Sequence, residues 1–139
     1  GRRGRRGLSP DPMPDSTTHS EFADIFSRSR EILLAHSQSL VLVRDEPGDI
    51  YLNTAHQMKN GQPLFFGAAA IRKRYVSFHL MPVYVFPELL HSIPTQLERR
   101  RHGKSCFNIK HPDDVIFAAL EQLTARGISQ YRRAGYVPD

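Results

Sequence analysis

Apolar residues recur at helical spacing in two stretches of the chain. In residues 20–37, Ser20 is placed to cap a helix, and one stripe of positions is apolar apart from Ser29. That stripe consists of Phe22, Ile25, Phe26, Ile32 and Leu33. Arg28 and Arg30 lie largely off the stripe, so the pattern predicts an amphipathic helix that covers a flat surface.

The second helical pattern occupies residues 112–133. Asp113 and Asp114 follow a proline at its start, where negative charge is favourable near the positive end of the helix dipole. Its predicted buried stripe is Val115, Ile116, Ala119, Leu120 and Leu123. Gly127 either kinks this helix or divides it from a shorter one.

Between the two helices, β-rich runs alternate with turn residues. Strands are predicted at residues 40–44, 50–55, 63–71, 74–81 and 104–110. Short turns, such as the one at Asn60-Gly61, join the first four into an antiparallel meander. The small side chains of residues 67–70 let a helix approach closely or leave room above the sheet, and close packing is the preferred explanation.

Two short helices are expected between the meander and the last strand, at residues 86–92 and 94–101, and Met81-Pro82 is expected to end the preceding strand. The chain therefore predicts an α+β fold. Its sheet is mostly antiparallel, has about five strands and carries helices packed on one face.

Strict alternation gives two of the strands an apolar side and a polar side. The apolar sides hold Val76, Phe78 and Leu80 in one strand and Ser105, Phe107 and Ile109 in the other. If both face the helices, the opposite sides form one surface with Tyr75, Ser77, His79, Lys104, Cys106 and Asn108. Arg74 and Tyr84 add further hydrogen-bond donors, which completes our candidate ligand-binding set.

Composition limits the classes of function. With 139 residues, of which 40% are hydrophobic, the chain is long enough for one domain with a single core. No apolar run approaches about 18 residues, so neither a transmembrane helix nor a membrane partner is predicted. The single cysteine, Cys106, excludes an internal disulfide and a cysteine-rich zinc site, and it favours a reducing cytoplasm.

Part of the net charge of +5 lies at the amino terminus. Residues 1–19 carry four arginines and two aspartates, and they are rich in glycine and proline, so we predict a disordered tail followed by a single domain at residues 20–139. The basic runs 99–101 and 132–133 each end a predicted helix, where positive charge is favourable for the helix dipole alone. Since no RNA- or DNA-binding motif is present, specific nucleic-acid binding is not predicted.

The polar surface allows three kinds of chemistry. Cys106 and His79 could form a nucleophilic pair, although no oxyanion-hole or cysteine-hydrolase motif accompanies them. The same two residues and a further histidine could bind a metal, although the histidines show no ligand-spaced motif. Aromatic and polar side chains that converge on a sheet are also suited to recognising a small ligand or an anion, and we favour this hypothesis.

The amino-acid sequences of three segments resemble those of the YdhG-like domain family, a family of unknown function. The segments are Pro63-Leu-Phe-Phe-Gly-Ala, Lys73-Arg-Tyr-Val-Ser-Phe-His-Leu-Met-Pro-Val-Tyr and Gly103-Lys-Ser-Cys-Phe-Asn-Ile-Lys. The resemblance covers roughly residues 20–134. It implies a small α+β domain of bacterial cytoplasmic proteins without established catalytic residues.

Some members of that family are described as frataxin-like iron chaperones, which implies iron as an alternative ligand. Iron binding of that kind uses clustered surface carboxylates. The residues on which this alternative rests are Glu21, Asp24, Asp45, Glu46 and Asp49. In the first helix the carboxylates are interleaved with Arg28 and Arg30, so they form no continuous acidic ridge.

Our leading hypothesis is thus a non-enzymatic cytoplasmic domain that binds a small molecule or a protein partner through the polar sheet face and needs no cofactor. Iron or other metal handling is the alternative, and a Cys/His enzyme comes third. An exposed edge or face of the sheet could also form a homodimer interface.

Overall fold

The computed structural model describes residues 16–139. Residues 1–15 of the predicted tail lie outside the described residues, and residues 16–19 belong to the first helix. Helix α1 spans Ser16–Leu34, and the short 3-10 helix η1 spans Ser37–Ser39. The expected bounds of 20–37 are therefore wrong at both ends, and Ser20 lies inside the helix rather than capping it. The sequence offers several serines and threonines in a row before Phe22, and any of them is a suitable first residue by type.

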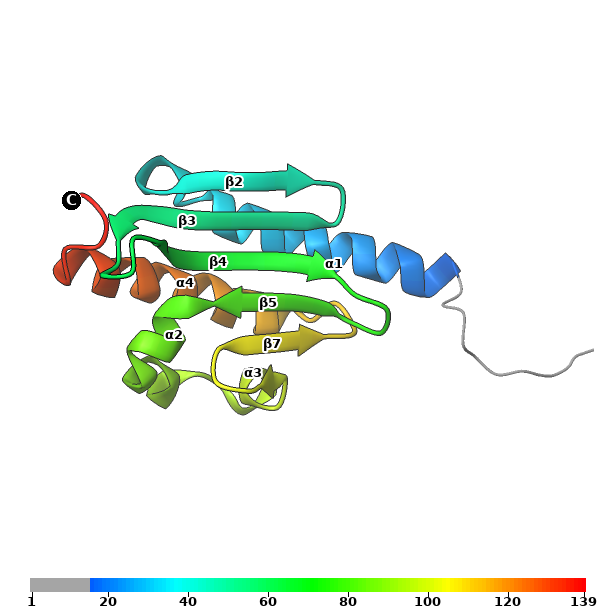
Figure 1. Cartoon of the computed structure of the whole chain (residues 1–139). Coiled ribbons are helices and arrows are strands. Elements are labelled where there is room, and N and C mark those ends of the chain that lie inside the picture. The colour runs from blue at the N-terminus through cyan, green and yellow to red at the C-terminus, as the bar shows by residue number, and fades with distance from the viewer. Residues whose placement is uncertain (1–15) are drawn as a thin grey trace, which may run out of the picture.

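Six strands form one antiparallel sheet in the order β2-β3-β4-β5-β7-β6 (Figure 1). Their bounds are Val41–Glu46 for β2, Asp49–Gln57 for β3, Pro63–Ile71 for β4, Val76–Leu80 for β5, Arg101–His102 for β6 and Cys106–Ile109 for β7. The predicted meander is confirmed as β2 to β5. β7 then pairs with β5, and the two-residue β6 forms the far edge.

The helices cover one face of this sheet, as expected. Figure 1 shows α1 and α4 (Asp114–Arg133) behind the strands, while the other face of the sheet is open toward the viewer. The apolar sides of the strands supply the core with Ile50, Leu52, Phe66, Val76, Phe78, Leu80, Phe107 and Ile109, and α1 and α4 supply Ile25, Leu33, Leu120, Leu123 and Tyr131. The sequence-predicted α+β fold is therefore confirmed.

One residue of the predicted α4 stripe lies outside the core. Val115 is 46% exposed, whereas Ile116, Ala119, Leu120 and Leu123 are buried. Consecutive helical residues are about 100° apart around the axis, so Val115 and Ile116 cannot both lie at the centre of one stripe. Ile116 takes the buried position.

The segment between β5 and β7 is more irregular than the sequence predicted. Met81-Pro82 does end the strand, and it begins α2 (Met81–Val85) with the proline in the first turn. The expected helix 86–92 is the 3-10 helix η2 (Pro87–Ser92), and the expected helix 94–101 is only α3 (Thr95–Glu98). The chain leaves α3 early because Arg101 enters β6, where it is registered with Phe107.

Gly127 does not divide α4, which runs unbroken from Asp114 to Arg133. A Cβ atom at this position would lie 3.0 Å from Cβ of Pro82. Glycine therefore allows α4 and α2 to pack in direct contact.

The small residues of β4 serve both purposes suggested by the sequence. A Cβ atom on Gly67 would lie 2.9 Å from Cδ2 of Leu33 in α1 and 3.2 Å from the carbonyl oxygen of His79, so close packing holds on the helix side. Ala68 and Ala70 alternate with it, and they lie under a hollow on the open side.

We expect Gly67→Val to lower the free energy of unfolding by about 1–3 kcal/mol, because an added side chain must displace a fully buried leucine or the neighbouring strand. Urea denaturation followed by circular dichroism measures this change. Ala68→Val is the matched control, and its cost should stay below about 1 kcal/mol because its side chain enters the hollow. Equal costs at both positions would contradict the assigned faces.

Candidate functional site

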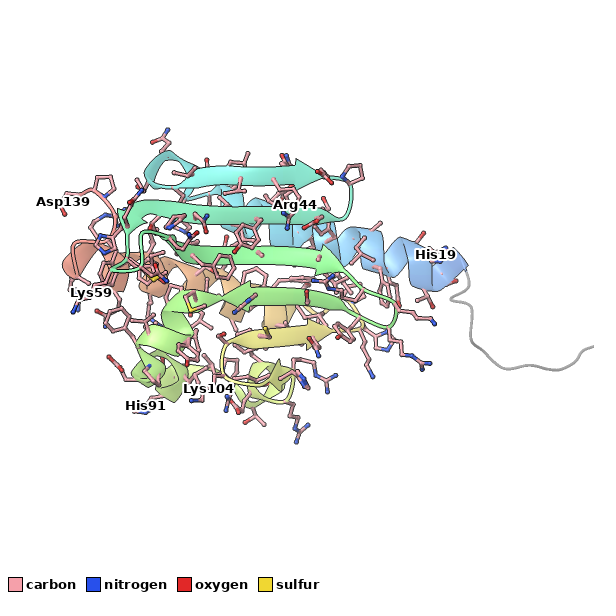
Figure 2. The ribbon with its side chains drawn as sticks, viewed as in Figure 1. His19, Arg44, Lys59, His91, Lys104 and Asp139 are labelled. Atoms are coloured by element: carbon pink, nitrogen blue, oxygen red, sulfur yellow. The ribbon has the colours of Figure 1, made fainter. Side chains whose placement is uncertain are left out.

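The open face of the sheet contains a hollow of about 320 Å³ above β4. Ala68 and Ala70 form its floor, where any larger side chain would fill the space. Arg44, at the β2 side of the hollow, is labelled in Figure 2 on the face of the sheet that the helices leave open. The hollow therefore lies on the side of the sheet opposite the helix layer.

Strand register brings the lining residues into two rows. In the first row, Ala68 is registered with Tyr51 on one side and His79 on the other, and Cys106 follows His79 and is itself registered with His102. In the second row, Ala70 lies between Asp49 and Ser77, and Asn108 follows Ser77. Each row thus places a methyl group between larger polar or aromatic neighbours, which creates the hollow.

Three rings form one wall of the hollow. The ring centroids of Tyr51 and Phe65 are 4.6 Å apart with 26° between the ring planes, so the two rings are stacked. His79 lies edge-on to Phe65, with a centroid distance of 4.9 Å. Because ring contacts of this kind restrict side-chain rotation, the wall is organised before any ligand binds.

Two arginines supply positive charge to the hollow. The guanidinium of Arg44 lies 5.1 Å above the ring of Tyr51, and its Nε donates a hydrogen bond of 2.8 Å to Oδ2 of Asp49. Arg72 also lines the hollow, and within residues 16–139 it forms no ion pair with a carboxylate. The hollow therefore carries a net positive charge, since Asp49 compensates only Arg44.

His79 and Cys106 lie opposite each other on β5 and β7, so the pairing of these strands brings the two residues together. Burial lowers the pKa of His79, and Nε2 of its ring is 2.9 Å from Oγ of Ser105. Burial also raises the pKa of the Cys106 thiol, and the positive charge of Arg72 opposes that rise only in part. Both shifts favour the neutral forms of the two groups, whereas a cysteine nucleophile acts as the thiolate.

The raised pKa of Cys106 predicts slow alkylation. At about pH 7.5 iodoacetamide should modify Cys106 more slowly than a free cysteine thiol, and the midpoint of the rate–pH profile should lie above that of a free cysteine. Mass spectrometry of the intact protein at timed intervals measures the rate. The same protein in urea serves as the control, because unfolding removes the burial that raises the pKa. A fast reaction with a midpoint below that of free cysteine would revive the nucleophile hypothesis.

The hollow gathers most of the candidate set that the sequence indicated. Tyr75, Ser77, His79, Cys106 and Asn108 all line it. Lys104, labelled in Figure 2, lies instead in the turn before β7, where strand alternation no longer applies. Its Nζ is 5.4 Å from the ring centre of Tyr84. Arg74 is exposed in the connection between β4 and β5 and does not line the hollow.

Other lining residues were not among the sequence candidates. They are Arg44, Asp49, Tyr51, Phe65, Ala68, Ala69, Ala70, Arg72 and His102. The signal for Tyr51 was available, because it alternates with the apolar Ile50 and Leu52 as His79 alternates with Phe78 and Leu80. No such signal marked His102, since a two-residue strand is too short to show a period.

The carboxylates of the iron alternative are distributed over separate interactions. Asp45 accepts two hydrogen bonds from Arg30, of 2.9 and 2.7 Å, and Asp49 pairs with Arg44. Glu21 is 3.2 Å from Nδ1 of His111, while Asp24 and Glu46 are exposed. Throughout residues 16–139, no group of three or more His, Cys, Asp or Glu residues is arranged to hold a metal ion.

The outer edge of β2 is the part of the sheet most suited to a protein partner. Val41, Leu42 and Val43 are 45%, 45% and 51% exposed, and within residues 16–139 β2 pairs only with β3. Unpaired apolar edges of this kind favour the addition of another strand. A homodimer through this edge stays a prediction.

In the described part of the chain, no helix combines the length and apolar character needed to cross a lipid bilayer.

Comparison with known proteins adds no relative: no protein-family model, curated protein or solved structure matches this chain. The resemblance to the YdhG-like family therefore stays a prediction.

Proposed function

We propose that this protein binds a small, planar, negatively charged organic molecule in the hollow on the open sheet face, and that it does so without catalysing a reaction. The observation that carries the proposal is the joining of three features in one place. An alanine floor leaves the space, stacked aromatic rings border it, and Arg72 adds uncompensated positive charge.

The size of the hollow selects a single-ring ligand. At about 320 Å³ it lies at the lower end of the range of roughly 300–1,000 Å³ that is usual for small-molecule sites. A flat ring can lie on the methyl groups of Ala68 and Ala70 with its edge or face against Phe65 and Tyr75. The guanidinium group of Arg72 can then bind a carboxylate on that ring through two parallel hydrogen bonds.

Polar groups around the hollow can fix the orientation of such a ring. Ser77 and Asn108 are registered with each other and present a hydroxyl and an amide to the hollow. The neutral imidazole of His79 can either donate or accept a hydrogen bond. Hydrogen bonding to a ligand requires no change in the protonation of these groups, and this supports binding rather than catalysis.

The single cysteine supports a cytoplasmic location, as the sequence suggested.

A thermal-shift screen tests the proposal. Monocyclic aromatic carboxylates such as benzoate should raise the melting temperature by an amount that grows with RT ln(1 + [L]/Kd), whereas the uncharged amides of the same rings should not. Arg72→Gln should remove this preference for carboxylates, and Arg133→Gln, which lies outside the hollow, should preserve it. The proposal fails if no compound of the series stabilises the protein, or if carboxylates and amides act alike.

A further inference from the structure

A second hollow lies between α3 and the N-terminal end of α4, and it shares no lining residue with the site described above. It has a volume of about 300 Å³, and basic side chains line much of it: Arg99, Arg100, Lys110 and His111. We call it the basic groove. We infer that the basic groove is a binding site for a phosphate group, independent of the ligand proposed for the open sheet face.

The groove exists because the chain separates three consecutive arginines. α3 ends at Glu98, and β6 begins at Arg101. Arg101 turns away to Glu98, to whose carboxylate oxygens it donates bonds of 2.8 to 3.1 Å. Arg99 and Arg100 remain to line the groove. The backbone carbonyl of Arg100 accepts a 2.8 Å hydrogen bond from the amide of Asn108, which anchors this arginine beside the end of β7.

Lys110 and His111 reach the same groove from the C-terminal end of β7. They follow the arginines in sequence after β6, a turn and β7, and the pairing of these two strands brings the two groups together. His111 is held by Glu21 of α1, whose carboxylate oxygen lies 3.2 Å from its Nδ1. The groove is therefore built from two separate segments of the chain, residues 96–100 and 110–116.

Three cations of the groove have no ion-pair partner among the described residues. Within residues 16–139 no carboxylate forms an ion pair with Arg99, Arg100 or Lys110. The one acidic residue of the lining, Asp113, is the N-cap of α4, and its Oδ1 accepts hydrogen bonds from the amides of Val115 and Ile116 at 2.9 and 3.4 Å. This capping occupies the first amides of α4, so attraction for an anion comes from the side-chain cations.

Two guanidinium groups and an ammonium group around one hollow have the donor set that proteins use for phosphate. Guanidinium groups bind phosphate oxygens in pairs, and a lysine adds a mobile point charge. The phosphate could belong to a small phosphorylated molecule or to the backbone of a single-stranded RNA. These two sources share their chemistry and are separated by the experiment.

Calorimetric titration of the full chain with tripolyphosphate at low salt tests the small-ligand source, and fluorescence anisotropy with a labelled single-stranded RNA tests the other. Arg100→Gln/Lys110→Gln should weaken binding of at least one probe by about tenfold or more, since two of the groove cations are lost. Arg133→Gln is the control of equal chemistry outside the groove, and it should bind as the unmodified chain does.

A gain-of-charge variant guards against a loss caused by misfolding. Gln96 lines the groove from α3 and is exposed, so Gln96→Lys adds a cation without disturbing the core, and it should tighten binding by about threefold. Tighter binding of tripolyphosphate identifies a small phosphate ligand, and tighter binding of RNA alone identifies the nucleic-acid backbone. The inference is overturned if neither probe binds below about 1 mM, or if the double variant and Gln96→Lys both bind as the unmodified chain does.

Discussion

Phe78→Ala should lower the free energy of unfolding by about 3–5 kcal/mol, the largest change in stability that we expect from a single substitution in this protein. Phe78 is 0% exposed and lies at the centre of the sheet, registered with Ala69 on one side and Phe107 on the other. The small Ala69 cannot expand into the space, so a cavity remains between the sheet and the helices. Because a domain of this size is stable by only about 5–15 kcal/mol, the midpoint of urea denaturation should fall strongly.

Phe65→Ala is the matched control on the opposite face. Phe65 is only partly buried and packs against Tyr51 and His79 in the open-face hollow. Its loss should cost clearly less stability than the loss of Phe78, because water can fill the space that it leaves. Its backbone carbonyl, which accepts a 2.8 Å hydrogen bond from the hydroxyl of Tyr131, is unaffected by the substitution. If both substitutions cost the same, our assignment of a buried and an open face is wrong.

Ala68→Leu should abolish ligand binding in the open-face hollow while leaving the fold intact, with a loss of affinity of about a hundredfold or more. The reason is steric: the leucine side chain would occupy the floor on which the proposed ring lies. Its neighbours in the row, Tyr51 and His79, stand on either side of the floor, so the added side chain projects into the hollow between them. Titration calorimetry with the most strongly bound carboxylate measures the loss.

Ala55→Leu provides the control for this substitution. Ala55 is an exposed alanine of β3 outside the hollow, so the same change of side chain occurs in a strand without blocking the site. Its affinity should match that of the unmodified chain, and both variants should keep their circular dichroism spectra. Undiminished binding by Ala68→Leu would place the ligand elsewhere on the protein and would refute the proposed site.

Much of the fold and part of the site could be predicted because the relevant patterns are local. The alternation of Val76, Phe78 and Leu80 with Ser77 and His79 specifies which side of β5 is buried, whichever strand lies beside it. The helical stripe of α1 is equally local, and it remained correct although both ends of the helix were misplaced. Lys104 was misplaced because it lies before the start of β7, where alternation carries no information.

By itself, the sequence determined an α+β domain with one apolar and one polar face on its sheet, because hydrophobic periodicity depends only on neighbouring residues. The tertiary structure decided which polar residues meet. The pairing of β3, β4 and β5 places Ala68 between Tyr51 and His79, and a register shift after Leu52 lies next to this row. Likewise, the pairing of β6 with β7 brings Arg100 and Lys110 to one groove. Both arrangements depend on contacts between distant segments, and such contacts are set by the packing of the whole chain.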